Sequence, residues 1–186
     1  MGEYNLFEGY DDVEESHGFD TEPLPTNWYH LILEKVLGTD ATKNGAVQAR
    51  CQVLVASGKL KGKRTFINVL MGPSMVNKDK TQRSTVELNK AKGNIQGQMK
   101  GFMMSIGCNT GEPLGESDVE KASSFYNVGM WDGRQFIGNI KHRAATGIYS
   151  ASNQLNGFHN IDDAKRGLEW LRAKDGAGNN QEAQTV

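Results

Sequence analysis

Three segments with β-strand character, separated by two glycine-containing turns, are the strongest constraint on the fold of this chain. Residues 29–36 and 65–71 alternate apolar and polar side chains, and residues 47–55 are rich in β-branched ones. The turns between them read ATKNG at 41–45 and SGKLKGKR at 57–64. Short strands joined by turns with Gly and Asn are typical of antiparallel sheets. The sequence therefore predicts an antiparallel meander that opens a sandwich or a barrel.

The rest of the chain adds helices and two more strands. We expect a long basic loop at 72–84 within an insertion at 72–92, a helix around 93–106, a short helix at 118–124, strands at 130–143 and 148–158, and a last helix that begins at Asn160 or Asp162 and ends near residue 174. The apolar residues of the 93–106 helix fall at i, i+4, i+7, i+8 and i+11, which places them on one face.

Glycines at 93, 97 and 101 recur every fourth residue on a neighbouring face of that helix. Each glycine costs about 1 kcal/mol in a helix interior. We therefore expect close packing of this face on the sheet as compensation.

The predicted order of elements is three strands, a helix, two strands and a final helix. A helix between the third and fourth of five strands is the order of an oligonucleotide/oligosaccharide-binding (OB) barrel. The predicted fold class is therefore mainly β: a five-stranded, OB-fold-like β-barrel with a helix between strands 3 and 4 and a C-terminal helix.

Charge is strongly segregated along the 186 residues, although the net charge is only −1. Residues 1–25 hold eight acids and no Lys or Arg, whereas residues 26–174 hold 21 Lys/Arg and 12 Asp/Glu. We expect an acidic flexible arm at 1–25, a nucleic-acid-binding domain at 26–174 and a disordered tail at 175–186. The arm would either compete with a polyanionic ligand or serve only to solubilise the protein, and both interpretations remain open.

Several function classes fit the sequence poorly. No apolar run reaches the roughly 18 residues of a membrane span, so no membrane association is expected. The domain's carboxylates are scattered rather than clustered for Mg²⁺, and no His/Cys spacing fits zinc. The glycine-rich phosphate-binding and GxSxG motifs are absent. We therefore expect neither an enzyme nor a cofactor, and the two cysteines, Cys51 and Cys108, fit core thiols in a reducing cytosol.

A single strand of nucleic acid is held by cations on its phosphates and aromatic rings under its bases. The candidate cations are Lys43, Arg50, Lys59, Lys61, Lys63, Arg64, Arg134, Lys141 and Arg143. The candidate stacking rings are Trp131, Tyr149, Phe66 and Trp28. Each has a structural alternative: Phe66 and Trp28 suit a core, Trp131 could cap the barrel, and the lysine-rich turn could be an ordinary solvated hairpin that protects a sheet edge from aggregation.

The order of several short motifs resembles a bacteriophage family of small OB-fold proteins, first catalogued without a function and since regarded as single-stranded DNA-binding proteins. The matching segments read EPLPTNWY at 22–29, TKNG at 42–45, SGKLKGKR at 57–64, MWDGRQF at 130–136 and SASNQLNGF at 150–158, together with the helix around 93–106. The resemblance spans about 130 residues and implies binding of single-stranded DNA during phage replication or recombination.

Two function hypotheses follow. The first is a non-enzymatic single-strand binder that coats or protects single-stranded DNA, located in the host cytoplasm if the chain is phage-encoded. Single-stranded RNA is an alternative ligand, since it also presents phosphates and bases. The second is an adaptor that recruits phage or host replication or recombination proteins through the acidic arm. A structural component of a virion or nucleoid is a third, weaker alternative.

Overall fold

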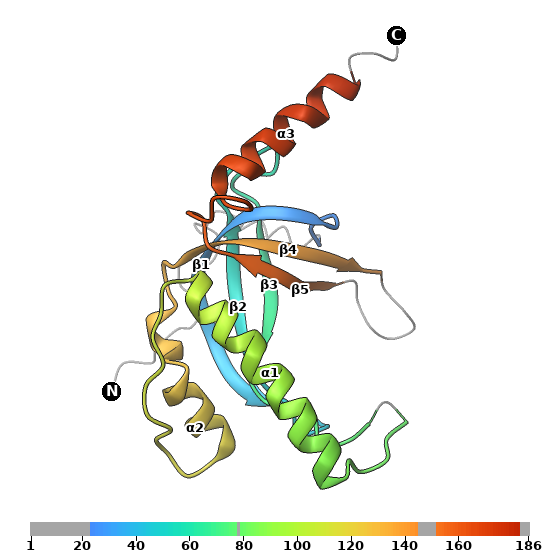
Figure 1. The fold of residues 1–186 in the computed structure, drawn as a ribbon, viewed down its shortest axis with the longest axis vertical. Helices are drawn as coiled ribbons and strands as arrows, with labels where there is room; N and C mark the ends of the chain where they lie inside the picture. The colour runs from blue at the N-terminus through green and yellow to red at the C-terminus, as the bar shows by residue number, and fades with distance from the viewer. Residues whose placement is uncertain (1–22, 78, 145–151, 183–186) are drawn as a thin grey trace, which may run out of the picture.

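The structure, a computed structural model, describes residues 23–77, 79–144 and 152–182. This part of the chain forms one five-stranded antiparallel sheet in the order β3-β2-β1-β4-β5, with helices packed against it (Figure 1). The strands are β1 (Asn27–Ala41), β2 (Val47–Val55), β3 (Arg64–Leu70), β4 (Gln135–Arg143) and β5 (Ser152–His159). The helices are α1 (Thr85–Ser105), α2 (Asp118–Phe125), the short 3₁₀ helix η2 (Val128–Met130) and α3 (Leu168–Glu182).

The central strand β1 gives the sheet its curvature. Its first six residues pair with β4, and from Leu31 onward it pairs with β2. The β1–β2 register shifts twice, between Leu33 and Lys35 and between Val36 and Gly38. Such bulges bend a strand and increase its twist. As a result, one long strand serves both halves of a strongly curled sheet.

Curling brings the two edge strands close together without joining their backbones. Asn153 on β5 donates its side-chain Nδ2 proton to Thr65 Oγ1 on β3, over 2.6 Å. No backbone ladder connects β3 and β5 among the described residues. The mainly β class and the five antiparallel strands are confirmed. In the described part of the chain the sheet is open and curled, and it is not closed into the predicted barrel.

The core lies between the inner face of this sheet and the helices. Helix α1 contacts β4 and β5, and α2 contacts β1 and β2. Phe102 of α1 is at the centre, with edge-to-face contacts to Trp131, Phe136 and Phe158 at centroid distances of 5.2, 5.5 and 5.6 Å. Each such pair contributes about 0.5–1.5 kcal/mol beyond the area it buries. The aromatic cluster therefore fixes α1 on the sheet.

The helix α1 is longer than predicted, because its start is capped by a motif in the segment assigned to the insertion. Ser84 Oγ accepts from the Glu87 backbone N–H, and the Glu87 carboxylate accepts from the Ser84 backbone N–H. This reciprocal capping box satisfies two of the free N–H groups at a helix start. Residues 72–84 remain a loop, as expected, with one isolated bridge between Val76 and Gln82.

The prediction that all three glycines of α1 pack closely is wrong for two of them. A Cβ added at Gly93 or Gly97 would meet nothing within 4 Å, so these positions are open. At Gly101 an added Cβ would lie 3.0 Å from the Phe158 ring. Only this glycine is required for the close approach of α1 to β5.

The last helix starts later and ends later than predicted. Asn160 and Asp163 accept hydrogen bonds from backbone N–H groups two or three residues on, which forms turns instead of a helix start. Side-chain bonds of this kind compete with helix formation. The helix α3 then continues to Glu182, through residues assigned to a disordered tail. It projects from the end of the sheet where β1 begins (Figure 1).

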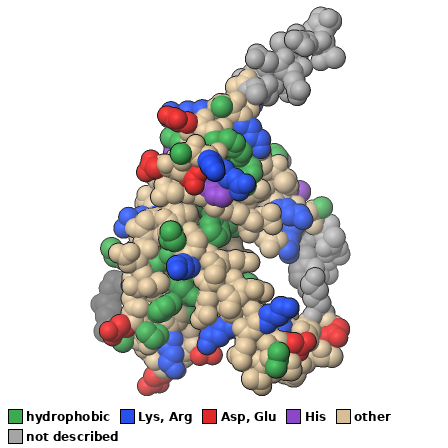
Figure 2. Space-filling view, viewed as in Figure 1, with side chains coloured by type: hydrophobic (Ala, Val, Ile, Leu, Met, Phe, Trp, Pro, Cys, Tyr) green, Lys and Arg blue, Asp and Glu red, His purple; other side chains and the backbone are tan. Residues whose placement is uncertain are grey.

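The space-filling view in Figure 2 shows the side of the molecule that carries α1. Basic and acidic side chains are interspersed over this side rather than gathered into one patch. Both cysteines are free thiols; Cys51 is fully buried, which raises its pKa to about 12, and Cys108 is partly buried. Within the described ranges, no helix has the length and apolarity needed to cross a membrane.

Candidate nucleic-acid interface

The outward-facing side of β2 and β3, opposite the core, carries a two-column array of polar, charged and aromatic side chains. We call it the outer face of β2–β3. Strand alternation buries every second residue and turns the others outward. The burial patterns of both strands show this alternation. The cross-strand neighbours on the outer face are Leu54 with Arg64, Gln52 with Phe66, Arg50 with Asn68, and Gln48 with Leu70.

Arg50 and Phe66 form the central contact of this face. The Arg50 guanidinium lies over the Phe66 ring, with its carbon 5.9 Å from the ring centroid. Phe66 is partly exposed, and Arg50 is exposed. The core interpretation of Phe66 is therefore wrong, and a partly exposed ring with a cation beside it offers both kinds of contact that a single strand needs.

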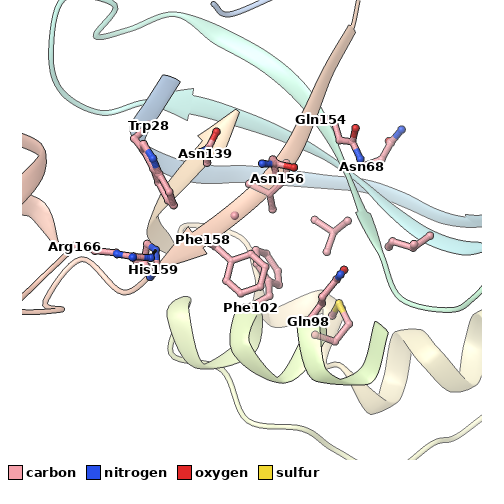
Figure 3. Close-up of a pocket in the computed structure, with 15 residues that line it drawn as sticks. Trp28, Asn68, Gln98, Phe102, Asn139, Gln154, Asn156, Phe158, His159 and Arg166 are labelled. Carbon is pink, nitrogen blue, oxygen red and sulfur yellow. Dashed lines mark hydrogen bonds between the residues drawn. The ribbon is translucent and has the colours of Figure 1, made fainter. Parts of the chain in front are cut away.

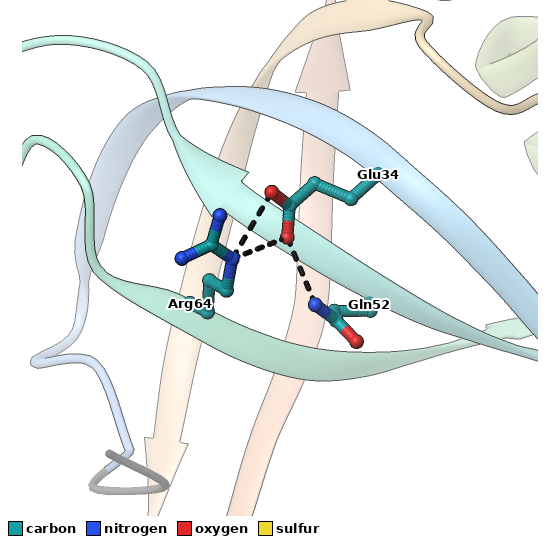
Figure 4. Close-up of polar contacts among 3 residues, drawn as sticks. All are labelled: Glu34, Gln52 and Arg64. Carbon is teal, nitrogen blue, oxygen red and sulfur yellow. Dashed lines mark hydrogen bonds and ion pairs between the residues drawn. The ribbon is translucent and has the colours of Figure 1, made fainter. Parts of the chain in front are cut away.

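Arg64 lies on the same face but already has an internal partner (Figure 4). Its Nε donates to both Glu34 carboxylate oxygens, over 3.0 and 2.8 Å, and Gln52 Nε2 donates to the same carboxylate over 2.9 Å. The pKa of Glu34 is lowered, chiefly because Arg64 donates to it, and the pKa of Arg64 is raised by the same hydrogen bond. A phosphate would therefore compete with Glu34 for this cation.

The lysine-rich hairpin joins β2 to β3 at one end of the outer face. Its backbone is closed by bonds from Val55 N–H to Lys63 O and from Gly62 N–H to Val55 O, both 2.9 Å. Gly58 and Gly62 adopt φ values of 83° and 90°, a region that favours glycine. The turn therefore depends on these two glycines and holds Lys61 exposed beside the outer face. Lys59 is exposed as well, and Lys63 is partly buried.

The other predicted cations lie elsewhere. Lys43 is exposed in the turn between β1 and β2, and Lys141 and Arg143 are exposed near the end of β4. Arg134 donates from Nε to the Met130 carbonyl over 3.2 Å, close to Gly107 after α1. The structure thus brings Arg50, Arg64, Phe66 and the hairpin together and leaves these four cations outside that group.

The prediction of Trp131 as a stacking platform is wrong. Its side chain is 0% exposed, packs edge-to-face on Phe102, and donates its Nε1 proton to the Tyr126 carbonyl over 2.9 Å. A buried indole in this position has no free ring face for a base. The alternative, that Trp131 belongs to the core, is the one that the structure supports.

The other two candidate stacking rings are those of Tyr149 and Trp28. Tyr149 lies outside the described residues. Trp28 is partly buried, stacked on His159 at a centroid distance of 5.0 Å and an interplanar angle of 26°, with Trp170 against its edge at 5.8 Å. At least one face of Trp28 is therefore already covered by the protein.

Sequence reasoning missed several residues of the outer face because it selected charged and aromatic types. Gln52, Asn68 and Leu70 were passed over, although the period-2 pattern of 47–55 and 64–70 places them beside Arg50 and Phe66. Applying that alternation to every residue of the two strands would have identified them. Glu34 was missed because it is the extra residue of the bulge between Leu33 and Lys35, from which its carboxylate accepts a hydrogen bond from Gln52.

Within the described residues, no group of three or more His, Cys, Asp or Glu is arranged to hold a metal ion. In comparisons with known proteins, no protein-family model and no curated protein matches the chain. The resemblance to the phage single-strand-binding family therefore depends on the motifs alone and stays a prediction.

Proposed function

We propose that the protein binds single-stranded DNA, without catalysis, through the outer face of β2–β3. The observation that carries the proposal is the Arg50–Phe66 pair, a partly exposed ring with a cation beside it in the centre of a two-stranded face. Stacking of a base on an aromatic ring contributes about 1–3 kcal/mol and tolerates any base. The hairpin lysine Lys61 and the cations of the neighbouring strands would contact phosphates.

We further infer that the sheet is an OB fold in its open form. OB folds are partly open five-stranded barrels that bind oligonucleotides on the face of strands 2 and 3. The strand order, the helix between β3 and β4, and the Thr65–Asn153 bridge between the edge strands support this inference. Arg50, Arg64, Phe66 and the lysine-rich hairpin lie on or beside β2 and β3, the strands whose face would bind the ligand in such a fold.

A role in phage DNA replication or recombination follows only from the resemblance, and we propose it on that basis. The ligand would be DNA exposed as single strands in the host cytoplasm. A non-sequence-specific binder suits this role, because stacking and phosphate contacts do not depend on base identity.

The test is competition binding with the full-length chain. A fluorescein-labelled dT oligomer is titrated with protein at low salt, and unlabelled duplex DNA or single-stranded RNA is added as competitor. We expect unlabelled single-stranded DNA to displace the probe and duplex of the same length to displace it far less. Absence of binding at low salt would reject the proposal and favour the adaptor, which a pull-down with residues 1–25 as bait would then test.

A further inference from the structure

A groove separates the edge strands β3 and β5 on the side of α1 (Figure 3). Asn153 and Thr65 close one end of the gap between the strands. Farther along, residues 68–70 and 154–159 form opposite walls, and α1 forms the floor. The groove has a volume of about 560 Å³, within the range of small-molecule sites.

Carboxamide side chains dominate the polar lining. They are Asn68 of β3, Gln98 of α1, Asn139 of β4, and Gln154 and Asn156 of β5. None of the five makes a side-chain hydrogen bond to another described residue. A carboxamide offers one acceptor and two donor protons. The groove therefore presents an array of unused donors and acceptors from four elements of the fold.

The floor and one end of the groove are apolar and aromatic. Phe102 and Phe158 pack edge-to-face at 5.6 Å, and Trp28 and His159 lie stacked at the end. Gly157 allows the Trp28 ring to lie close to β5, because an added Cβ would lie 3.2 Å from that ring. Phe102 is buried beneath Phe158, so a flat ligand would meet the partly exposed Phe158 ring below and carboxamides at its edges.

The described residues of the groove carry almost no charge. Among the described residues that line it there is no Asp or Glu, and Arg166 is the one Lys or Arg. Arg166 lies with its Nη1 3.3 Å from His159 Nε2. Burial, followed by the nearby Arg166, lowers the pKa of His159, which favours the neutral form of its ring. This lining suits an uncharged polar group and is unlike a phosphate channel, which needs several cations.

We propose that the groove binds an unstacked nucleobase of the bound single strand and hydrogen-bonds to its edge through the carboxamides. The inference rests on the proposed function and adds base selectivity to it. Asn68 and Leu70 belong both to the outer face of β2–β3 and to the groove wall. A strand held on the outer face can therefore place one base into the groove. Asn and Gln pair with base edges through paired donor and acceptor contacts.

The test compares base-bearing and abasic ligands. Anisotropy titrations use oligomers of about twelve nucleotides, a length within the site size of one OB fold. The set is dT, dC and dA, and an oligomer whose central nucleotides lack bases. We expect the wild type to distinguish the three homopolymers and to bind the abasic oligomer more weakly than the best of them, by about tenfold, the effect of one good base contact.

Matched carboxamide pairs isolate the groove. The variant Gln98→Ala/Asn156→Ala removes two groove carboxamides, whereas Gln96→Ala/Asn89→Ala removes two exposed carboxamides of α1 outside it. We expect the groove variant to lose the preference among homopolymers while keeping the wild-type salt dependence and affinity for the abasic oligomer. The control variant keeps the wild-type profile, and urea midpoints confirm that both variants fold.

The outcomes separate the two proposals. A wild type that binds all oligomers alike, or a groove variant with the wild-type base profile, overturns the groove assignment and leaves single-strand binding intact. A wild type that binds no oligomer at low salt overturns both.

Discussion

Arg64 donates its Nε proton to both carboxylate oxygens of Glu34, and this ion pair lies on the same face as the partly exposed Phe66 ring. One of the cations expected to bind phosphate is therefore partly neutralised from within the protein. Such a pair lowers the affinity of the face for a phosphate, because the phosphate must either displace the carboxylate or bind next to it.

Replacing Glu34 by Gln should strengthen binding to a dT oligomer. The change releases Arg64 and removes a negative charge from the face, and we expect an affinity about three- to tenfold higher at low salt, with a steeper salt dependence. Anisotropy titrations at two salt concentrations measure it. The control is Asp40→Asn, the same loss of charge on β1 away from Arg64. Equal effects of both variants would show that Glu34 acts only through net charge.

Removing the Phe66 ring should weaken binding without unfolding the protein. We expect Phe66→Ala to lower affinity for dT by about tenfold or more, because a stacking contact is lost. The ring is only partly buried, so the urea midpoint should fall slightly. The control Leu54→Ala removes an apolar side chain from the same face. If Leu54→Ala weakened binding equally, stacking on Phe66 would not be the cause.

The Trp131→Ala variant should lose stability rather than affinity for DNA. Loss of a fully buried indole should lower the free energy of unfolding by about 3–5 kcal/mol. The variant also leaves the Tyr126 carbonyl without its indole donor. Urea denaturation measures the loss, and binding is compared at a temperature where the variant is folded. A Trp131 variant of wild-type stability and reduced affinity would restore the stacking interpretation.

Acid should destabilise the protein through the two capping boxes. The pKa values of Glu87 and Glu120 are lowered, chiefly by hydrogen bonds from the Ser84 and Ser117 backbone N–H groups. A carboxylate with a lowered folded-state pKa stabilises the native state above its unfolded pKa. That contribution is lost as the pH falls from about 4.5 through the folded value.

Gln retains the capping geometry but cannot titrate. The double variant Glu87→Gln/Glu120→Gln should therefore lose less stability than the wild type between about pH 6 and about pH 3, a range that spans the ordinary carboxylate pKa of about 4.5. Thermal unfolding at several pH values measures this. The matched change Glu112→Gln, at a carboxylate with no hydrogen bond to another described residue, should leave the acid limb as in the wild type. An equal loss of stability at low pH in the wild type and the double variant would contradict a role of the two capping-box carboxylates in the acid sensitivity.

The strand pattern was readable from the sequence because antiparallel alternation is local. The strand at 47–55 was predicted to the residue, and the helices after 92 and at 118 were located, since each has a clear apolar spacing or an N-terminal cap. The end of β1 at Ala41 was missed because two bulges interrupt its alternation. The start of α3 was missed because Asn160 and Asp163 form turns where a cap was expected.

The site was predicted only in part, because exposure depends on packing that no local pattern reveals. Trp131 precedes a glycine turn and Phe66 stands in an alternating strand, yet the first is fully buried against Phe102 and the second faces outward. The groove was not predicted at all. Its carboxamides come from four elements, and only the curled sheet and α1 together place them around one space.

The most direct test of the central claim is the dissociation constant of the wild type and Arg50→Glu for a dT oligomer, measured across a salt series. We expect tight wild-type binding at about 50 mM salt that weakens at least tenfold by about 200 mM, as phosphate neutralisation requires. Arg50→Glu should weaken binding at every salt concentration and flatten the slope. Wild-type affinity that is unaffected by salt, or an Arg50→Glu variant that binds as the wild type does, would contradict binding of single strands on the outer face of β2–β3.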